Sequence, residues 1–218
     1  MPTLLLRLAG PMQSWGTRSR FDERDTDLEP SKSGVIGLLC AAMGIDRAEE
    51  GPVLQLARCR MGVRVDREGV LRVDYLTAQT AKGQTSVSRR YYLADAVFLV
   101  GLEGEDKEVL AKAHQALRNP VWPLWLGRKS YVPSPGVYLP DGLVEAPLEQ
   151  ALQTYPLLVV PERKAQKVTC RFVVESRERV GSIRMDQPRS SFAKRKFAAR
   201  YVEGYYWEVS HVPEPSPA

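Results

Sequence analysis

Residues 3–9 have the sequence TLLLRLA, a nearly continuous apolar run that a Gly-Pro pair ends at once. A short apolar run ended in this way predicts a strand at the centre of a sheet. The next apolar run, GVIGLLCAAM at residues 34–43, lies between Ser33, a residue type that caps helices, and Gly44, a residue type that ends them. This run is apolar on every side, so it predicts a buried helix.

Strand patterns and one more helix follow. Apolar and polar residues alternate over residues 58–66 and 70–77, on either side of an Arg-Glu-Gly turn, which predicts a hairpin. Residues 91–102 return to a strand pattern, and residues 105–118 place their apolar side chains on one helical face. A further strand over residues 121–126 would complete the order β-α-β-β-α-β, which is the ferredoxin-like (RRM-like) arrangement.

The chain changes character after residue 120, where prolines recur. A short helix over residues 148–153 and strands over residues 168–175 and 205–209 predict a smaller, β-rich C-terminal part. We therefore expect an α+β protein with a ferredoxin-like domain over residues 1–120, a basic β-rich domain over residues 121–212 and a disordered tail over residues 213–218.

Basic residues are concentrated in one part of the chain. The 218 residues carry a net charge of +5, and the isoelectric point is near 9.1. Residues 163–200 contain twelve Lys and Arg against three Asp and Glu, so this segment carries +9 and the rest of the chain −4. The excess fits either a solvated basic surface or contact with nucleic acid, and its uneven distribution favours nucleic acid.

The residue types needed for metal or cofactor chemistry are sparse. Cys40, Cys59 and Cys170 form no C-x-x-C pair, and His114 and His211 are far apart, so we expect buried thiols, no metal site and no cofactor. The P-loop pattern G-x-x-x-x-G-K-[ST] does not occur. No apolar run reaches the roughly 18 to 20 residues that cross a bilayer, so we expect a cytoplasmic chain without membrane contact.

Four segments carry side chains suited to RNA. The polar loop at residues 12–21 combines hydroxyl, guanidinium and aromatic groups, which can hold phosphates and stack on bases. Residues 30–34 begin the buried helix, where free N–H groups attract phosphate. Residues 82–90 connect two strands, and residues 127–130 place a glycine beside two cations. The candidate RNA-binding residues are Ser14, Trp15, Arg18, Arg20, Ser31, Lys32, Ser33, Lys82, Arg89, Arg90, Gly127, Arg128, Lys129 and Tyr131.

Each candidate also has a purely structural explanation. Trp15 and Phe21 can fill the core, and the serines near residue 32 can act only as a helix cap. The polar segment at residues 82–90 can be a plain surface loop. For Trp15 and for this loop, the sequence alone leaves the choice open.

Three motifs, in a fixed order, are similar to those of a known family. The sequences LAGPMQSWGTRSRF at residues 8–21 and PSKSGVIGLL at residues 30–39 resemble the N-terminal signature of the CRISPR-associated protein 5 family, which is part of the RAMP superfamily. The sequence LGRKSYVPSP at residues 126–135 is similar to that family's second signature. The chain length also fits, and the details are most similar to the type I-E branch.

The resemblance implies an RRM-like domain with a thumb hairpin, which corresponds here to residues 78–90. It implies a non-catalytic role in Cascade, the crRNA-guided surveillance complex of antiviral defence. In that role the subunit caps the 5′ handle of the crRNA, and its thumb lies near the first guide nucleotides and the target DNA. Its protein partners would be the backbone subunit that forms the filament and the large subunit that recognises the PAM.

The type I-C branch of the same family implies a different activity. Its members are metal-independent endoribonucleases that process pre-crRNA with Tyr, Lys and His, the last two adjacent in sequence. Neither histidine of this chain directly follows a lysine, and Lys112 and His114 would lie on one helix flank. We therefore expect no catalytic residues. The endoribonuclease is the main alternative, and a general nucleic-acid chaperone is the other.

Overall fold

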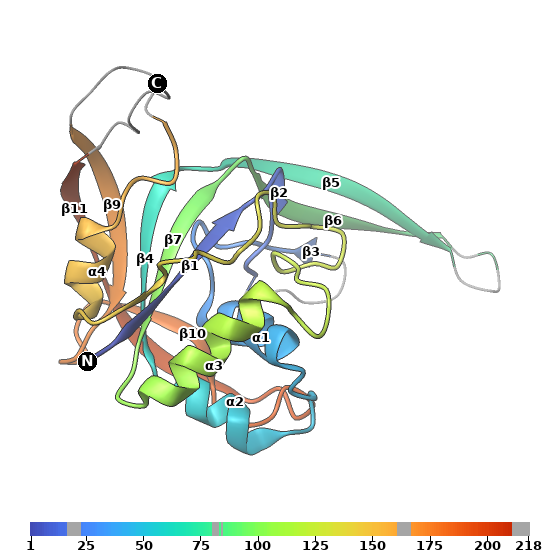
Figure 1. Cartoon of the computed structure of the whole chain (residues 1–218). Helices are drawn as coiled ribbons and strands as arrows, with labels where there is room; N and C mark the ends of the chain where they lie inside the picture. The colour runs from blue at the N-terminus through green and yellow to red at the C-terminus, as the bar shows by residue number, and fades with distance from the viewer. Residues whose placement is uncertain (17–22, 80–82, 84, 161–166, 211–218) are drawn as a thin grey trace.

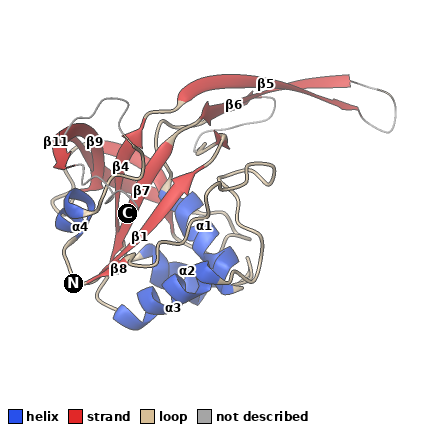
Figure 2. Cartoon of the chain, turned by 45° about the horizontal axis from the view of Figure 1, so that its top comes forward, coloured by secondary structure: helices blue, strands red, loops and turns tan. Residues whose placement is uncertain are grey.

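The structure is a computed structural model that describes residues 1–16, 23–79, 83, 85–160 and 167–210. A large twisted sheet runs through the molecule, with helices on both faces, and a second, smaller sheet contains a long hairpin that projects from the body of the protein (Figures 1 and 2). None of the helices in these ranges is long and apolar enough to cross a membrane.

The centre of the sheet has ferredoxin-like topology. The strands β4 (Arg60–Arg67), β7 (Val97–Glu103), β1 (Thr3–Ala9) and β8 (Leu143–Val144) lie in this spatial order and are antiparallel. Helix α1 (Lys32–Met43) lies between β1 and β4 in sequence, and α3 (Lys107–Arg118) follows β7. This order of elements confirms the predicted ferredoxin-like α+β fold.

Both faces of the sheet are covered, which explains why residues 3–9 are apolar at almost every position. Leu4, Leu6 and Leu8 of β1 belong to the core under α1 and α3, whereas Leu5 belongs to a second core with Phe172. Helix α4 (Leu148–Thr154) covers the second face (Figure 2), and it matches the helix predicted over residues 148–153. A strand buried on both faces needs apolar residues throughout.

The last strand of the ferredoxin-like order was predicted at the wrong place. Residues 121–126 form no strand, and the two-residue β8 takes the edge position. The N–H groups of Val121 and Trp122 donate instead to the carbonyls of Ala42 and Ala41, at 3.0 and 3.1 Å. Prolines at positions 120 and 123 have no N–H to give to a strand ladder, so this segment packs on the end of α1.

The predicted hairpin over residues 58–77 is also wrong. Strand β4 pairs with β7 and β9, and β5 (Val70–Gln79) pairs with β6 (Thr85–Ala94) in the projecting hairpin of Figure 1. Residues 61–66 are all buried and need neighbours on both sides, whereas most of β5 is exposed. The polar loop expected over residues 78–90 is therefore shorter, because residues 85–90 belong to β6.

The C-terminal strands extend the same sheet. Strands β9 (Lys167–Glu175), β11 (Phe197–Ser210) and β10 (Ser182–Pro188) follow β4 in this order across the sheet. The strands predicted at residues 168–175 and 205–209 are confirmed, whereas β10 and helix α2 (Glu50–Ala57) were not predicted. A domain boundary near residue 120 stays a prediction. The tail at 213–218 lies outside the described residues.

Candidate nucleic-acid interface

The loops that carry the three sequence motifs meet at the N-terminal end of α1. The backbone N–H of Ser14 donates to the carbonyl of Leu126 at 3.1 Å. Gly127 follows with φ of +93°, and a Cβ at this position would lie only 1.8 Å from the carbonyl oxygen of Ser14. The close contact between the two loops therefore requires glycine at position 127.

Arg128 fixes the same loops to one another. Its guanidinium donates to the hydroxyl of Tyr131 at 3.0 Å and to the carbonyls of Arg24 and Tyr91 at 3.2 and 3.0 Å. These bonds connect residues 128–131 to the short strand β3 (Glu23–Arg24) and to β6. Arg128 therefore positions the loops, and only part of its hydrogen-bonding capacity is left for a ligand.

Between these loops lies a pocket of about 440 Å³, which we call the arginine pocket. Six residues expected to bind RNA line it: Ser14, Trp15, Ser31, Ser33, Gly127 and Arg128. No motif of the sequence indicated an RNA-binding role for the other lining residues, which include four that are charged and two that are aromatic: Arg24, Asp25, Arg47, Arg195, Phe192 and Phe197. The pocket thus combines three signature segments with side chains from remote parts of the chain.

The charge of the arginine pocket is suited to an anion. Arg24, Arg47 and Arg195 are exposed, and none of them has an ion pair with a carboxylate in the described part of the chain. Phe197, beside them, is 38% exposed and offers an aromatic surface to a base. Of the three arginines, only Arg195 could have been suspected from the sequence as a nucleic-acid ligand, because it lies in the basic run at residues 194–196.

Trp15 does not have the expected stacking role. Its side chain is 1% exposed, and its indole Nε1 donates to Oε1 of Gln13 at 3.2 Å. The ring lies against Gly34 of α1 so closely that a Cβ on Gly34 would be 2.9 Å from it. The core-filling explanation is therefore correct for Trp15, which forms the floor of the pocket.

Lys32 does not have the expected phosphate-binding role. It is 1% exposed, and its Nζ lies 2.8 Å from Oε2 of Glu175. The backbone N–H of Lys32, one of the donors expected to attract phosphate, donates to Oδ2 of Asp186 at 2.7 Å. Burial lowers the pKa of Lys32, although Glu175 acts in the opposite direction. An ammonium group buried with its carboxylate partner cannot reach RNA.

The remaining candidates divide into three groups. Tyr131 is buried and accepts the hydrogen bond from Arg128, so it cannot stack on a base. Ser31 caps α1, because its hydroxyl accepts from the N–H of Gly34 at 3.3 Å. Ser33, rather than being the cap, is half-buried in the pocket. The exposed or half-buried Arg89, Arg90 and Lys129 stay candidates. Arg18, Arg20 and Lys82 lie outside the described residues.

The hairpin and the arginine pocket are neighbours. Strand β3 pairs in parallel with β6, so that Arg24 stands opposite Arg90 and Glu23 opposite Arg89. The guanidinium of Arg89 lies 5.8 Å from the ring centre of Tyr75 on the adjacent strand. A polyanion bound in the arginine pocket can therefore continue along the base of the hairpin.

Much of the basic excess at residues 163–200 is neutralised within the protein. Glu29 pairs with Arg171 and Arg184, Glu103 with Arg177, and Asp186 with Arg200. Lys194 also pairs with Glu50. The charge count of the segment therefore overstates its positive surface, and Arg195 and Lys196 are the exposed cations beside the pocket.

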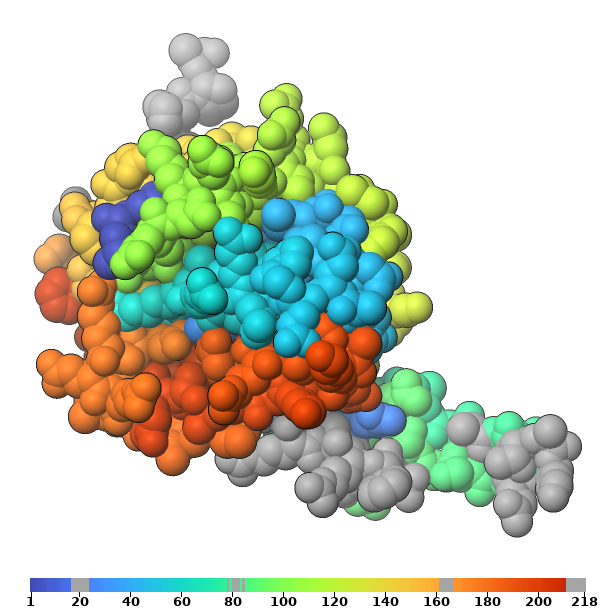
Figure 3. Space-filling view, turned by 90° about the horizontal axis from the view of Figure 1, so that it is seen from below, coloured from blue at the N-terminus to red at the C-terminus, as the bar shows by residue number. Residues whose placement is uncertain are grey.

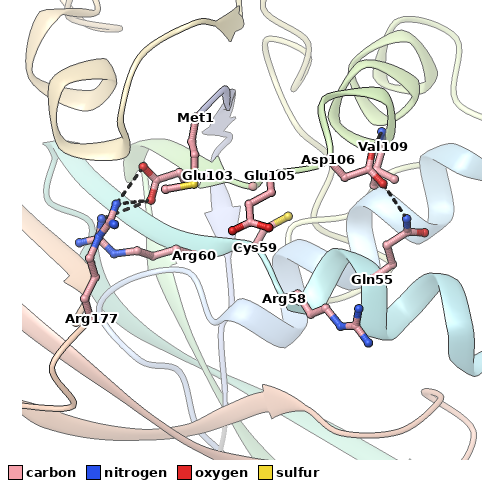
Figure 4. Close-up of a pocket in the computed structure, with 11 residues that line it drawn as sticks. Met1, Gln55, Arg58, Cys59, Arg60, Glu103, Glu105, Asp106, Val109 and Arg177 are labelled. Carbon is pink, nitrogen blue, oxygen red and sulfur yellow. Dashed lines mark hydrogen bonds and ion pairs between the residues drawn. The ribbon is translucent and has the colours of Figure 1, made fainter.

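A second pocket, of about 480 Å³, lies near the N-terminus (Figure 4). Arg177 donates to both carboxylate oxygens of Glu103 at 3.1 and 2.9 Å, and Arg60 lies 3.5 Å from the same carboxylate and pairs with Glu149. Burial raises the pKa of the Cys59 thiol, which keeps it protonated. Because carboxylates already pair with Arg60 and Arg177, this pocket is less suited to RNA.

His114, the histidine within the described residues, is held by contacts with its neighbours in the fold. Nε2 of His114 lies 2.7 Å from the carbonyl oxygen of Leu139, and the ring centre lies 4.8 Å from that of Tyr138. The described residues contain no group of three side chains that could hold a metal ion. The thiols of Cys40, Cys59 and Cys170 are free and buried, as predicted.

The fold and the arrangement of the loops define an RRM-like α+β protein with a projecting hairpin. The family model described as CRISPR-associated protein (Cas_Cas5) matches residues 3–203. The chain therefore belongs to this family of CRISPR-associated proteins.

Individual relatives agree with this assignment. The chain is 34% identical over 146 residues to the CRISPR system Cascade subunit CasD of Escherichia coli K12. The match covers 58% of this chain and 65% of CasD, so it spans slightly less than two thirds of the length of CasD. A crystal structure of a Cas protein matches with a TM-score of 0.82 and 53% identity over 99% of this chain and all of the other. A chain of a CRISPR RNA-guided surveillance complex matches with a TM-score of 0.76 and 35% identity, over 95% and 91% of the two chains.

Proposed function

We propose that this chain is a CasD-like subunit of a type I-E Cascade surveillance complex and binds the 5′ handle of the crRNA without cleaving it. The observation that carries the proposal is the meeting of three signature segments at the arginine pocket. The similarity to a chain of an RNA-guided surveillance complex over 95% of this chain supports it. Its partners would be the filament-forming backbone subunit and the large PAM-recognising subunit, and it would act in the cytoplasm.

The chemistry of the arginine pocket fits an RNA backbone better than a small metabolite. Arg24, Arg47 and Arg195 come from separate segments of the chain and line one pocket, so their guanidinium groups can contact consecutive phosphates. The hydroxyl of Ser33 adds a donor, and Phe197 offers a surface for one base. Trp15 and Lys32 contribute by holding the loops in place.

Removing two of the pocket cations should make RNA binding less sensitive to salt. In a variant with Arg24→Ala and Arg195→Ala, the log–log dependence of affinity on salt should become shallower by about 1.4, because each phosphate contact contributes about 0.7 for single strands. Titration of labelled handle RNA at several salt concentrations measures this slope. Arg118→Ala, which removes an exposed cation from α3, is the control and should change little. An unchanged slope in the double variant would remove the arginine pocket from the RNA site.

The same assay separates a handle-binding subunit from a general nucleic-acid chaperone. At raised salt, the wild-type chain should prefer handle-bearing RNA to a scrambled strand, because sequence-independent phosphate contacts weaken first. Equal affinity for the two strands would favour the chaperone.

Shortening the hairpin should leave the fold stable but impair function. Leu76 pairs with Ser88, so residues 77–87 can be replaced by an Asn-Gly turn without disturbing the register. The described side chains in the deleted part are exposed, and little buried area is lost. We expect an unchanged melting temperature, together with weaker complex assembly or DNA targeting in an interference assay. Normal assembly and targeting would show that the hairpin tip is only a surface connection.

The endoribonuclease alternative is tested by incubating the purified chain with repeat RNA in the absence of metal. We expect intact RNA, because His114 is held by Leu139 and Tyr138. His114→Ala should likewise leave crRNA maturation unchanged in cells. Specific cleavage by the wild-type chain that the substitution abolishes, with the fold intact, would establish the enzyme instead.

A further inference from the structure

An apolar groove of about 700 Å³ begins beside the arginine pocket and follows α1 toward its C-terminal end. We call it the tryptophan groove. Its main apolar walls are Leu38, Ala41, Ile45, Trp122, Trp125 and Phe192. In Figure 3 the blue surface of α1 and α2 lies between the green segment that contains α3 and the orange-red segment that contains β10 and β11. The tryptophan groove is lined by residues of α1 and the segment after it, by residues 122–129, and by Phe192, which lies between β10 and β11 in sequence.

Hydrogen bonds fix the walls of the tryptophan groove in their positions. The N–H groups of Val121 and Trp122 donate to the last turn of α1, and the N–H of Ala193 donates to the carbonyl of Arg47 at 2.8 Å. Phe192 lies opposite Gly37, where an added Cβ would be 3.8 Å from its ring. The groove therefore exists before any partner binds, and Trp122 stays 41% exposed in it.

An apolar groove of this size needs an apolar occupant. Trp122 is an exposed apolar side chain in this groove, and tryptophan is among the residues that contribute most at protein interfaces. At the rim, the exposed Arg47 and Lys129 outnumber the exposed Asp46. The complementary surface is therefore apolar with carboxylates at its margin.

We propose that the tryptophan groove binds an apolar segment, flanked by acidic residues, of a neighbouring protein subunit in the surveillance complex. The proposal rests on the proposed function, since it assumes that the chain is part of such a complex. It adds the surface and the chemistry of the contact.

The lining of the tryptophan groove favours protein over RNA. Trp122, Trp125 and Phe192 give the groove aromatic surfaces, but the side chains that face them across it include an aliphatic wall of α1, on which bases do not stack. Arg24 and Arg195 line the arginine pocket and not the groove. Phe192 and Arg47 line both, so RNA in the pocket and protein in the groove would lie side by side along this boundary.

A photoreactive residue tests the occupant directly. The complex is assembled from its subunits and crRNA with p-benzoylphenylalanine in place of Trp122, irradiated and analysed by mass spectrometry. The control carries the same residue in place of Trp207, which is 52% exposed on β11. We expect position 122 to cross-link to an apolar, Asp- or Glu-containing peptide of another protein subunit. A cross-link to RNA, to a second copy of this chain or to nothing would overturn the proposal.

Charge and polarity changes provide the second test. Trp122→Glu and Pro123→Glu should each lower retention of the neighbouring subunit at least tenfold in native mass spectrometry of the complex. Both should leave handle-RNA affinity of the isolated chain within about twofold, whereas Trp207→Glu should change neither quantity. Pro123 also lines the groove and is exposed, so this variant stays informative if Trp122→Glu misfolds. Full retention in Pro123→Glu would overturn the proposal, whereas failure of the RNA assays would contradict the proposed function instead.

Discussion

Replacing Glu175 by Gln should lower the free energy of unfolding by about 3 kcal/mol at neutral pH, because it leaves the buried ammonium of Lys32 without its counter-charge. The carboxylate of Glu175 accepts from Nζ of Lys32 at 2.8 Å and from the N–H of Met61 at 3.2 Å. The glutamate is 19% exposed, which keeps the expected loss at the lower end of the range for buried pairs. Urea unfolding at constant pH measures the change.

The loss should depend on pH in a defined direction. Burial lowers the pKa of Lys32 in the folded protein below its ordinary value of 10.5, whereas the unfolded chain keeps that value. The unfolded chain therefore binds this proton more tightly, and stability rises as the pH increases from the folded pKa toward 10.5. Without Glu175 the folded pKa falls further. The difference between wild type and variant should thus shrink in the alkaline range.

Two variants control for this interpretation. Glu208→Gln breaks the ion pair with Lys167, in which both side chains are more than 60% exposed, and should cost less than about 1 kcal/mol. Lys32→Met combined with Glu175→Gln should recover most of the stability, because no charge is left buried. A loss in Glu175→Gln no larger than in Glu208→Gln would show that the buried pair is not maintained in solution.

Gly127→Ala should both destabilise the protein and weaken RNA binding. At φ of +93°, an alanine is strained by about 1–3 kcal/mol, and its Cβ would overlap the Ser14 carbonyl oxygen. The loops at residues 13–15 and 126–128 would have to separate, which widens the arginine pocket and moves Arg128. We expect at least a tenfold loss of affinity for handle RNA, measured together with urea unfolding.

The matched control is Gly136→Ala, in the same segment of the chain. No atom lies within 4 Å of the Cβ that this substitution adds, and Gly136 has no positive φ. Stability and RNA affinity should therefore be close to wild type. If Gly127→Ala behaved like this control, the close contact between Ser14 and Gly127 would not shape the RNA site.

The local elements could be predicted because their signals lie within a few residues. The apolar run at residues 3–9 predicted β1, and the one-sided pattern at residues 105–118 predicted α3 to within two residues. Gly44 adopts the left-handed conformation that ends α1, as its residue type suggested. Residues of the segments 8–21, 30–39 and 126–135 line the arginine pocket together, and their role in RNA binding stays a prediction.

Pairing between strands could not be predicted in the same way. The alternation over residues 70–77 predicts a strand and its two faces, but it does not identify the neighbouring strand. Strand β4 is hydrogen-bonded to β7 on one edge and to β9 on the other, so β5 pairs with β6 instead. The segment at residues 121–126 was apolar enough for a strand, but its prolines and the free carbonyls at the end of α1 gave its N–H groups another partner.

The amino-acid sequence was enough to predict the α+β class, the central strands, the buried helix and the three loops that meet at the candidate RNA site. Only the tertiary structure shows which cations are available to a ligand there. Lys32 is neutralised by Glu175, 143 residues away, whereas Arg24, Arg47 and Arg195 meet at one opening from three separate segments. The physical reason is that folding brings distant residues next to a charged group and so decides whether the group is buried or exposed. The residues beside it in the sequence do not indicate which distant residues these will be.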